Sequence, residues 1–556
     1  MTALHDLALP SSDHAALSGM AFVAFCGVGA LTLMMCVLTG PDSDHPEEFY
    51  TGYGSSSPLR GGLAIAGDYI SAVTVLGTGG VIALCGYDGV MIAVSTALSL
   101  ALVMFLFTER LNGTGRFTLG DVLAHRLPGR PARIAVGAVT ILALLPMMLV
   151  QLADIGRLMA YILGFSSGTA KTGCVVGLGL LIITYSAIGG MQGTALIQSL
   201  KTVVLLASGT VTALLVLHRF DWDFGAFLGA AAQHSGVGAA FLRPGLQFGT
   251  GGMSRVNLVV SNLTIVLGVA CLPHNTMRMY SASGAGRSRR SASWAVSFVT
   301  LFMLVMVVVE LGATALLGRA AVGAADAQGN TAYLLGSRAA LGSSVSTADS
   351  VLFMLMTTAI LLTVLGSVAG VLLACANSLA HDVFATRDPD LPAAREVKMA
   401  RWSTLTIGVP TIALATLAQQ YSLLPLALLS SCVGASAIAP ALLYSLFWRR
   451  YTSTGLVATL VAGSVAVLLV APGTQLISGT PFSVFPHADF AWLPFSTTGI
   501  VSIPAGFFFG WLATVRSTPV ASGPYERTRS DAPMADRTAS RRGAVGHASS
   551  FTSVRP

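Results

Sequence analysis

The segment GGLAIAGDYISAVTVLGTGG (residues 61–80) decides how the whole sequence is interpreted, because it places polar and flexible residues inside an apolar run. One carboxylate, Asp68, lies in its middle, Ser71 follows three residues later, and six glycines surround them. Glycine weakens a helix, and an ionisable group at membrane depth usually faces a cavity or a partner. We expect the glycines to let this helix break and turn backbone carbonyls towards a cation. Tight packing of a regular helix through small residues explains them equally well.

The composition is that of an integral membrane protein. Of the 556 residues, 54% are hydrophobic and 10% are charged, whereas soluble domains contain roughly 25% charged residues. No basic run with interleaved aromatics supports nucleic-acid binding. The seven cysteines are scattered without CxxC spacing, so we expect neither a disulfide framework nor a metal site built on them. HExxH and paired-carboxylate motifs are also missing from the sequence, and we expect a protein that is not an enzyme.

Thirteen apolar runs are long enough to predict membrane-spanning helices. With the N-terminus outside, 23 Lys and Arg residues fall on the cytoplasmic side and six on the outer side, which follows the positive-inside rule. We therefore expect a multi-pass protein of the cell membrane with a cytoplasmic C-terminus. The predicted spans lie near residues 17–39, 61–85, 88–108, 134–163, 170–188, 195–217, 257–277, 292–318, 350–380, 402–419, 422–448, 454–472 and 494–515.

Several ionisable side chains besides Asp68 fall inside these spans. Arg157 lies three residues after an aspartate on the same helix face, and a structural ion pair is as good an explanation there as a functional one. Lys201 lies near the inner end of its span, where its ammonium group can simply reach the interface. His274 follows a proline near a helix end, which favours an ordinary interfacial histidine, and Glu310 is more isolated.

A second region of interest is the span near residues 350–380. Thr363, Gly366 and Ser367 follow one another at i, i+3 and i+4, so they share one face of the helix. Two hydroxyl groups on one face supply side-chain oxygens suited to a cation. Alternatively, each hydroxyl bonds the carbonyl four residues earlier in its own helix, which is common for Ser and Thr in such helices.

Several stretches together resemble the sodium/solute symporter family. The segment LAIAGDYISAVTVLGTGG is similar to the first core helix of the acetate-permease-like branch of that family. The similarity runs in matching order from about residue 45 to 450. Its other elements are EEFYTGYGSS (47–56), ITYSAIGGMQGT (183–194), GVACLPHNTMRMY (268–280) and NSLAHDVFA (377–385).

The resemblance implies an all-α, LeuT-type fold with about 13 transmembrane helices. The symporter core would occupy residues 46–450 as two inverted five-helix repeats. The repeats would cover about 61–217 and 257–449. The remaining parts would be an extracellular N-terminus with the first helix (1–45), two peripheral helices (451–515) and a disordered cytoplasmic tail (516–556).

The resemblance also implies a Na⁺ site between the two repeats. Carried over by position, its carbonyl ligands fall on Gly67 and Ile70, and its ligands on the second helix fall on Thr363, Gly366 and Ser367. Family members with a well-defined site have two adjacent hydroxyl residues where this chain has Gly366-Ser367. One side-chain ligand is therefore missing, and Thr363 is the residue placed to replace it. Family sugar and amino-acid carriers also have Gln where this chain has Leu272.

The function implied is Na⁺-coupled uptake of a small organic solute, most simply a short-chain monocarboxylate such as acetate. Asp68 would add negative potential beside the Na⁺ site. The alternatives are proton-coupled symport with Asp68 or Glu310 as the carrier, and a membrane sensor that does not transport. The expected partners are the solute, Na⁺ or H⁺ and the lipid bilayer, without a cofactor. Candidates for substrate binding or coupling are Asp68, Ser71, Arg157, Lys201 and His274.

Overall fold

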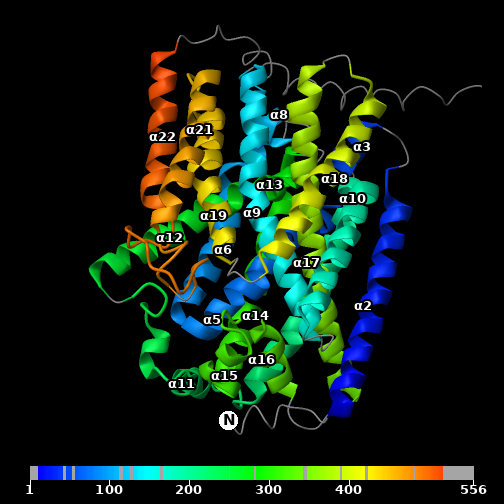
Figure 1. Ribbon diagram of the computed structural model, residues 1–556, viewed down its shortest axis with the longest axis vertical. Coiled ribbons are helices and arrows are strands. Elements are labelled where there is room, and N and C mark those ends of the chain that lie inside the picture. Colours follow the sequence, from blue (N-terminus) through cyan, green and yellow to red (C-terminus); the bar gives the residue numbers. More distant parts are fainter. Residues whose placement is uncertain are drawn as a thin grey trace, which may run out of the picture.

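The computed structural model describes residues 11–41, 45–52, 57–111, 117–125, 127, 129–162, 167–249, 251–280, 284–341, 347–388, 391–419, 424–480 and 482–517. Within these ranges the chain is helical, and β-structure is limited to the isolated bridges Thr474–Leu493 and Ser478–Phe485. The long helices lie side by side along the longest axis of the molecule (Figure 1). The predicted tail after residue 517 lies outside the described residues.

Ten long helices make up most of the bundle. Helix α2 lies at one flank, and the packed pair α21 and α22 lies at the opposite flank (Figure 1). The long helices are α2 (Ser11–Thr39), α6 (Tyr87–Leu106), α9 (Arg130–Ile162), α10 (Gly168–His218), α12 (Gly252–Cys271), α14 (Ala285–Leu317), α17 (Thr347–Ser378), α18 (Ala393–Leu417), α21 (Ser453–Val470) and α22 (Gly499–Arg516).

Shorter helices interrupt or connect the long ones. Two further spans are built from pieces, namely α4 (Pro58–Tyr69) with η2 (Val73–Thr78) and α5 (Gly79–Cys85), and α19 (Leu424–Val433) with η6 (Gly434–Ile438) and α20 (Ala439–Phe447). The others are α3 (Pro46–Thr51), α7 (Thr108–Leu111), α8 (Leu119–Ala124), α11 (Phe224–His234), η3 (Gly238–Leu242), α13 (Pro273–Tyr280), α15 (Arg319–Ala325), α16 (Ala332–Leu341), η4 (Leu379–Phe384), η5 (Ala385–Arg387) and η7 (Ala471–Gly473).

The predicted number of 13 spans is not confirmed. In the described part of the chain, nine helices are long and apolar enough to cross a membrane, or ten if the bent segment 58–85 counts as one span. One reason is that α10 runs for 51 residues and covers two predicted spans, which are separated only by a kink at Gly190. Gly190 has a φ of 50°, a left-handed conformation that glycine adopts without strain. Helix α18 matches a predicted span but is not among the nine.

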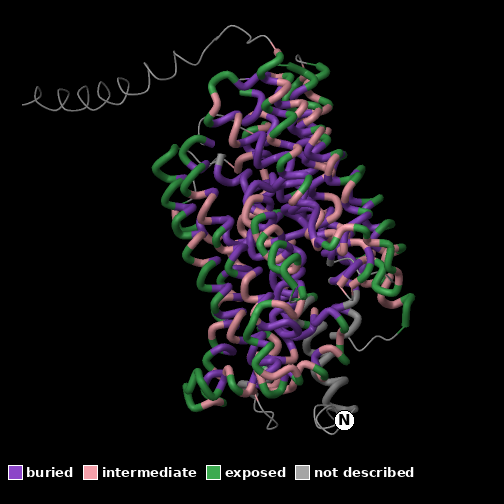
Figure 2. Tube along the Cα trace, turned by 90° about the vertical axis from the view of Figure 1, so that its left-hand side faces the viewer, coloured by how far each residue is buried: buried purple, intermediate pink, exposed green. Residues whose placement is uncertain are grey.

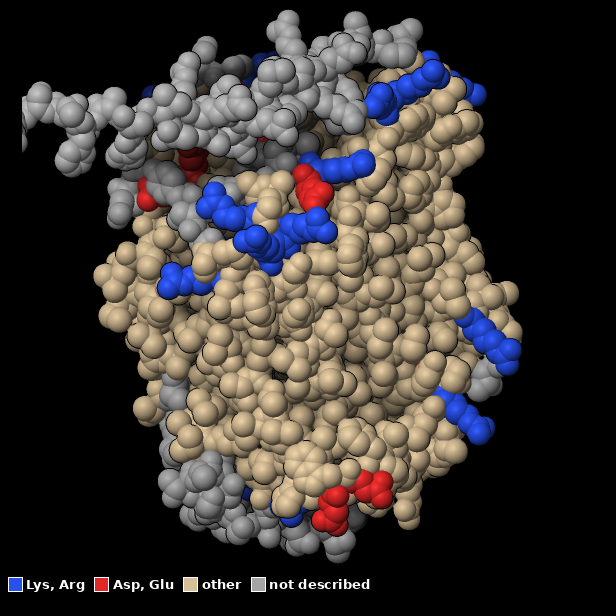
Figure 3. Space-filling view, turned by 180° about the vertical axis from the view of Figure 1, so that it is seen from behind, with Lys and Arg blue, Asp and Glu red and all other residues tan. Residues whose placement is uncertain are grey.

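The surface of the bundle is that of a membrane protein. Buried residues fill its centre, and exposed residues lie along its outer helices and at its ends (Figure 2). Large apolar side chains such as Phe105, Leu417 and Leu469 are exposed on these helices. On the face drawn in Figure 3, a broad area lacks charged side chains, and most Lys and Arg lie towards the end where α22 finishes. Together with the apolar helices, this surface supports a multi-pass membrane protein.

The segment 61–80 is broken, but its glycines are not at the break. Helix α4 ends at Tyr69 and the next piece starts at Val73, with a bend of 60° between them. Ile70, Ser71 and Ala72 form the break. The glycines instead allow close packing, because a β-carbon at Gly67 would lie 2.5 Å from the carbonyl oxygen of Gln198 on α10. We expected the glycines themselves to open the helix, and this is wrong. They allow tight packing, and the neighbouring break contains no glycine.

Candidate functional site

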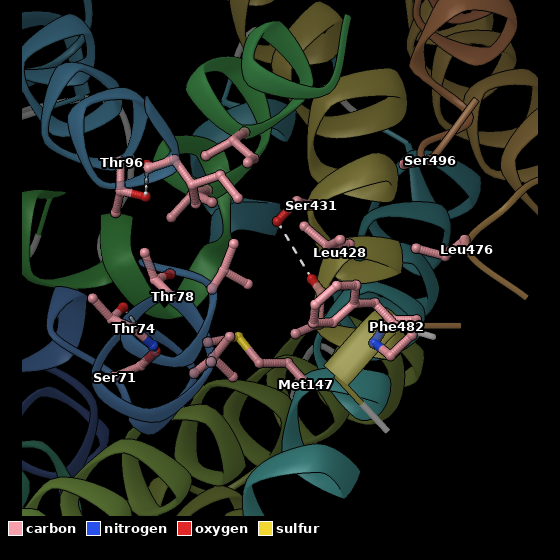
Figure 4. A pocket seen from close by; sticks show the side chains of 18 of the residues that line it. Ser71, Thr74, Thr78, Thr96, Met147, Leu428, Ser431, Leu476, Phe482 and Ser496 are labelled. Carbon is pink, nitrogen blue, oxygen red and sulfur yellow. Dashed lines mark hydrogen bonds between the residues drawn. The ribbon is translucent and has the colours of Figure 1, made fainter. Parts of the chain in front are cut away.

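A pocket of about 110 Å³ lies beside the break in segment 58–85. We call it the break pocket. Hydroxyl side chains from the broken helix form one side, and residues of α19 and the 471–498 segment form the opposite side (Figure 4). None of the described residues that line it is Asp, Glu, Lys or Arg. Those with polar side chains are Tyr69, Ser71, Thr74, Thr78, Thr96, Gln247, His274, Asn275, Ser431, Gln475, Thr480 and Ser496.

The broken helix gives the pocket a positive end without a charged side chain. The piece that starts at Val73 has N-terminal N–H groups without acceptors in their own helix, and a helix N-terminus favours anions. Ser71 partly caps it, because the Thr74 N–H donates to Ser71 Oγ over 3.3 Å. Ser71 Oγ also lies 3.2 Å from Thr74 Oγ1. Ser71, which the sequence marked as a substrate candidate, therefore lies at the pocket wall beside this helix start.

His274 and Asn275 add free hydrogen-bonding groups to the pocket. Both lie on α13 and both are buried, with 2% and 4% of their surface exposed. Asn275 Nδ2 donates to the carbonyl of Val269 over 2.8 Å. Within the part of the chain that the structure describes, His274 Nδ1 and Asn275 Oδ1 have no hydrogen-bond partner. Buried polar atoms are normally satisfied, so these two atoms stand out among the residues that line the break pocket. This differs from the expectation of an ordinary interfacial histidine.

Asp68 lies next to the break and forms a buried ion pair. Its carboxylate contacts Arg278 through Arg278 Nε, and both side chains are almost fully buried. Gln198 Nε2 donates to Asp68 Oδ1 over 2.6 Å. Neither Arg278 nor Gln198 was identified from the sequence, although Arg278 belongs to the quoted GVACLPHNTMRMY segment. The positive charge of Arg278 compensates the negative charge of Asp68. Asp68 is therefore not a free source of negative potential.

The side chain of Lys201 contacts two of the five residues of the predicted cation site. Its Nζ donates to the Gly67 carbonyl oxygen over 2.5 Å and to Ser367 Oγ over 3.1 Å. The side chain is fully buried, with 0% exposure, so it does not extend to the membrane interface. Sequence reasoning placed Lys201 near a helix end but did not place it between α4 and α17. Gly67 and Ser367 were predicted as Na⁺ ligands, and both already have a cation beside them.

The other predicted ligands are engaged or lie at the break. Gly366 has its carbonyl oxygen bonded to Gln198 Nε2 at 2.9 Å. Thr363 Oγ1 donates to the carbonyl of Ala359 in its own helix over 2.6 Å, which is the alternative left open by the sequence. Ile70 is buried at the break, where its N–H donates to the Ala66 carbonyl. Arg157 lies on α9, and its side chain is outside the described residues.

Glu310 on α14 lies apart from this cluster. It is fully buried, and both of its carboxyl oxygens lack a hydrogen-bond partner among the described residues. The carboxyl group of Glu310 occupies the space that a β-carbon at Gly79 would need. An ionised carboxylate without a partner is very costly to bury, so we infer that Glu310 is protonated and neutral.

A second group of charges lies around α8, and we call it the α8 network. His381 Nε2 lies 3.0 Å from Asp121 Oδ1, and His381 Nδ1 lies 2.6 Å from Glu396 Oε1. Arg133 Nη2 contacts Asp121 Oδ1 at 2.9 Å. Burial raises the pKa of Asp121, but its hydrogen bond with His381 and the nearby charges of His381 and Arg133 lower it below its ordinary value. The network ties α8, α9, η4 and α18 together, through residues that include the quoted NSLAHDVFA segment.

The fold and the site can now be compared with known proteins. The model of the sodium:solute symporter family matches residues 49–463. The chain belongs to this family. Its relatives include the monocarboxylic acid transporter of Corynebacterium glutamicum, with 32% identity over 510 residues that cover 90% of this chain and 91% of the relative. Another is the uncharacterized symporter YwcA of Bacillus subtilis (strain 168), with 31% identity over 509 residues that cover 90% and 94%.

Solved structures support the same fold. A Na⁺-coupled sialic acid symporter, solved in a substrate-bound outward-open state, matches with a TM-score of 0.71 at 13% identity, over 90% of this chain and 98% of the other. The nucleobase-cation-symport-1 transporter Mhp1 in a closed conformation matches with a TM-score of 0.51 at 14% identity, over 87% and 97%. The chain therefore has the LeuT-type fold of Na⁺ symporters. Family membership supports Na⁺-coupled uptake of a solute.

Proposed function

We propose that the protein takes up a short-chain monocarboxylate, such as acetate, propionate or pyruvate, together with a cation. A relative that shares 32% identity over 90% of this chain is named a monocarboxylic acid transporter, which supports this solute class. The protein would lie in the cell membrane with its N-terminus outside. The residues after Val515 would then be cytoplasmic, as the distribution of Lys and Arg indicates.

The observation that carries the proposal is the break pocket. It is small, lies at the interruption of a membrane-spanning helix, and places the N-terminal end of a half-helix opposite a polar wall. Discontinuous helices with this arrangement bind anionic groups of substrates in transporters. His274 lines the same space, and its Nδ1 has no hydrogen-bond partner among the described residues. A carboxylate fits these groups, and the apolar lining from Val269, Leu428 and Phe482 suits a short alkyl chain.

The cation has two candidates. Na⁺ is the first, because membership of the sodium:solute symporter family supports it. A proton is the second, and the specific observation that favours it is the ammonium group of Lys201 among the residues predicted to bind Na⁺. The carboxyl of Glu310, which has no hydrogen-bond partner among the described residues, is a further group to which a proton can bind.

The solute is tested by uptake of labelled pyruvate into proteoliposomes in the presence of unlabelled competitors. Pyruvate is preferred as the label because acetic acid crosses lipid bilayers unaided. We expect acetate and propionate to compete, whereas glucose and proline do not. His274→Ala should raise the pyruvate concentration needed for half-maximal uptake, while the control His218→Ala, at an exposed position on α10, should not. Competition by glucose or proline but not by acetate would contradict the proposed solute class.

A further inference from the structure

The side chain of Lys201 bridges three helices at the predicted cation site. It extends from α10 to the Gly67 carbonyl at the end of α4 and to the Ser367 hydroxyl on α17. These two oxygens come from the two repeats predicted by the family resemblance. An ammonium group with two oxygen acceptors at 2.5 and 3.1 Å makes contacts of the kind that a bound Na⁺ makes with carbonyl and hydroxyl oxygens. Unlike a bound Na⁺, the ammonium group is covalently attached to α10.

The remaining oxygens do not complete a second site for Na⁺ at this position. The Gly366 carbonyl accepts a hydrogen bond from Gln198, and the Thr363 hydroxyl donates to its own helix. The carboxylate of Asp68 is bound to Arg278 and Gln198. A Na⁺ ion among these groups would lie next to the ammonium of Lys201 in a region sealed from water, where like charges repel strongly. The residues present therefore do not fit Na⁺ while Lys201 is in place.

The packing around Lys201 indicates that its position is built into the fold. Gly67 has no side chain, which lets α10 approach α4 closely enough for the lysine to reach the carbonyl. The side chain is fully buried, as is that of Gln198 one turn earlier on the same helix. The charged and titratable groups that face it are Asp68 on α4 and Arg278 and His274 on α13. One carboxylate therefore faces two cations, and this balance leaves no surplus negative charge to attract another.

We propose that the ammonium of Lys201 is a tethered cation that takes the place of Na⁺ at this site. It holds α4, α10 and α17 together as a bound ion would, and this site does not bind Na⁺ in the wild-type protein. The inference relies on the proposed function only for the choice of transported solute. It predicts that Na⁺ becomes a ligand of this site when the ammonium is removed.

The first test measures Na⁺ binding without any solute. Binding of ²²Na⁺ and the shift in melting temperature on replacing choline with Na⁺ are measured for wild type, Lys201→Ala and the control Lys171→Ala. Lys171 lies in the first turn of the same helix, 30 residues before Lys201. We expect Lys201→Ala to gain Na⁺-dependent stabilisation that Ser367→Ala in the same background removes. Wild type and Lys171→Ala should show no Na⁺ effect that depends on Ser367. Na⁺ binding to wild type that is lost in Ser367→Ala would overturn the proposal.

The second test measures uptake of labelled pyruvate into proteoliposomes with and without an inward Na⁺ gradient. We expect the Na⁺ dependence of wild type to be unaltered by Ser367→Ala, whereas Lys201→Ala becomes dependent on Na⁺. If Lys201→Ala does not fold, Lys201→Arg is used, and it should bind no Na⁺ at this site because it keeps the positive charge. Absence of pyruvate uptake by wild type under any gradient would refute the proposed solute but not the tethered cation, which the binding experiment decides. Na⁺ binding by Lys201→Arg that depends on Ser367 would contradict it.

Discussion

Replacing Asp68 with asparagine removes the negative charge from a buried cluster that also contains Arg278 and Lys201. Asp68 faces Arg278 directly, and Lys201 lies nearby. With Asp68 present, one negative charge faces two positive ones. Asp68→Asn keeps the shape of the side chain but leaves both cations buried without a counter-charge. The variant also changes one acceptor of Gln198 from a carboxylate to an amide oxygen.

The magnitude follows from the burial of the pair. Both side chains are more than nine-tenths buried, and removing one partner of such a pair costs about 3–5 kcal/mol. That is a large part of a typical total stability of about 5–15 kcal/mol. Replacing both partners with neutral groups of similar size is expected to be far less harmful. We therefore expect Asp68→Asn to melt well below wild type, and Asp68→Asn/Arg278→Gln to recover most of the loss.

The assay is thermal unfolding of the purified protein in detergent, followed by tryptophan fluorescence and by the fraction that remains monodisperse. Arg278→Gln completes a double-mutant cycle, whose coupling term isolates the Asp68–Arg278 interaction. A matched control is Asp223→Asn, which alters an exposed carboxylate at the start of α11. If Asp68→Asn melts like wild type, or if the double variant is no more stable than the single one, the ion pair does not have the role described here.

Three further predictions concern the α8 network, Glu310 and the topology. Because the pKa of Asp121 is lowered in the folded protein, its stabilising contribution is present above its ordinary pKa and is lost as the pH falls through the lowered value. Asp121→Asn should therefore flatten the acid limb of a plot of melting temperature against pH, and an unchanged acid limb would contradict the role of Asp121. Glu310→Gln should leave the melting temperature within about 2 °C of wild type because the buried acid is already neutral; a large loss would show that it is ionised and paired. A reporter fused after Val515 should give a cytoplasmic signal and one inserted in 325–345 an external one, and a cytoplasmic signal from the second would overturn the orientation.

The fold could be predicted from the sequence because the patterns that indicate it lie within short, continuous segments. Apolar runs of sufficient length mark the helices, and the segment 61–80 carries both the interruption and the family resemblance. The number of membrane spans was harder to predict from the sequence. Whether two apolar runs form two helices or one kinked helix depends on the backbone at Gly190, and the sequence contains the same residues in either case.

The site was only partly predictable because its contacts join distant segments. Gly67 and Ser367 were identified by position, but Lys201 lies 134 and 166 residues from them in the chain. The placement of Lys201 depends on how closely α10 packs against α4. No pattern within a single segment of the sequence indicates that packing distance. Arg278 was visible as part of a resembling segment, yet its partner became clear only from the fold. The hydroxyl of Thr363 illustrates the opposite case, where the common local hydrogen bond was the correct alternative.

The central claim is that the protein moves a short monocarboxylate against its concentration gradient, driven by the inward gradient of Na⁺ or of protons. The most direct test is accumulation of labelled pyruvate in proteoliposomes under an inward Na⁺ gradient, an inward proton gradient, or neither, with empty liposomes as the reference. We predict that at least one gradient drives pyruvate inside above the external concentration, and that collapsing that gradient releases it. Equilibration without accumulation under both gradients, or uptake no greater than that of empty liposomes, would contradict the account.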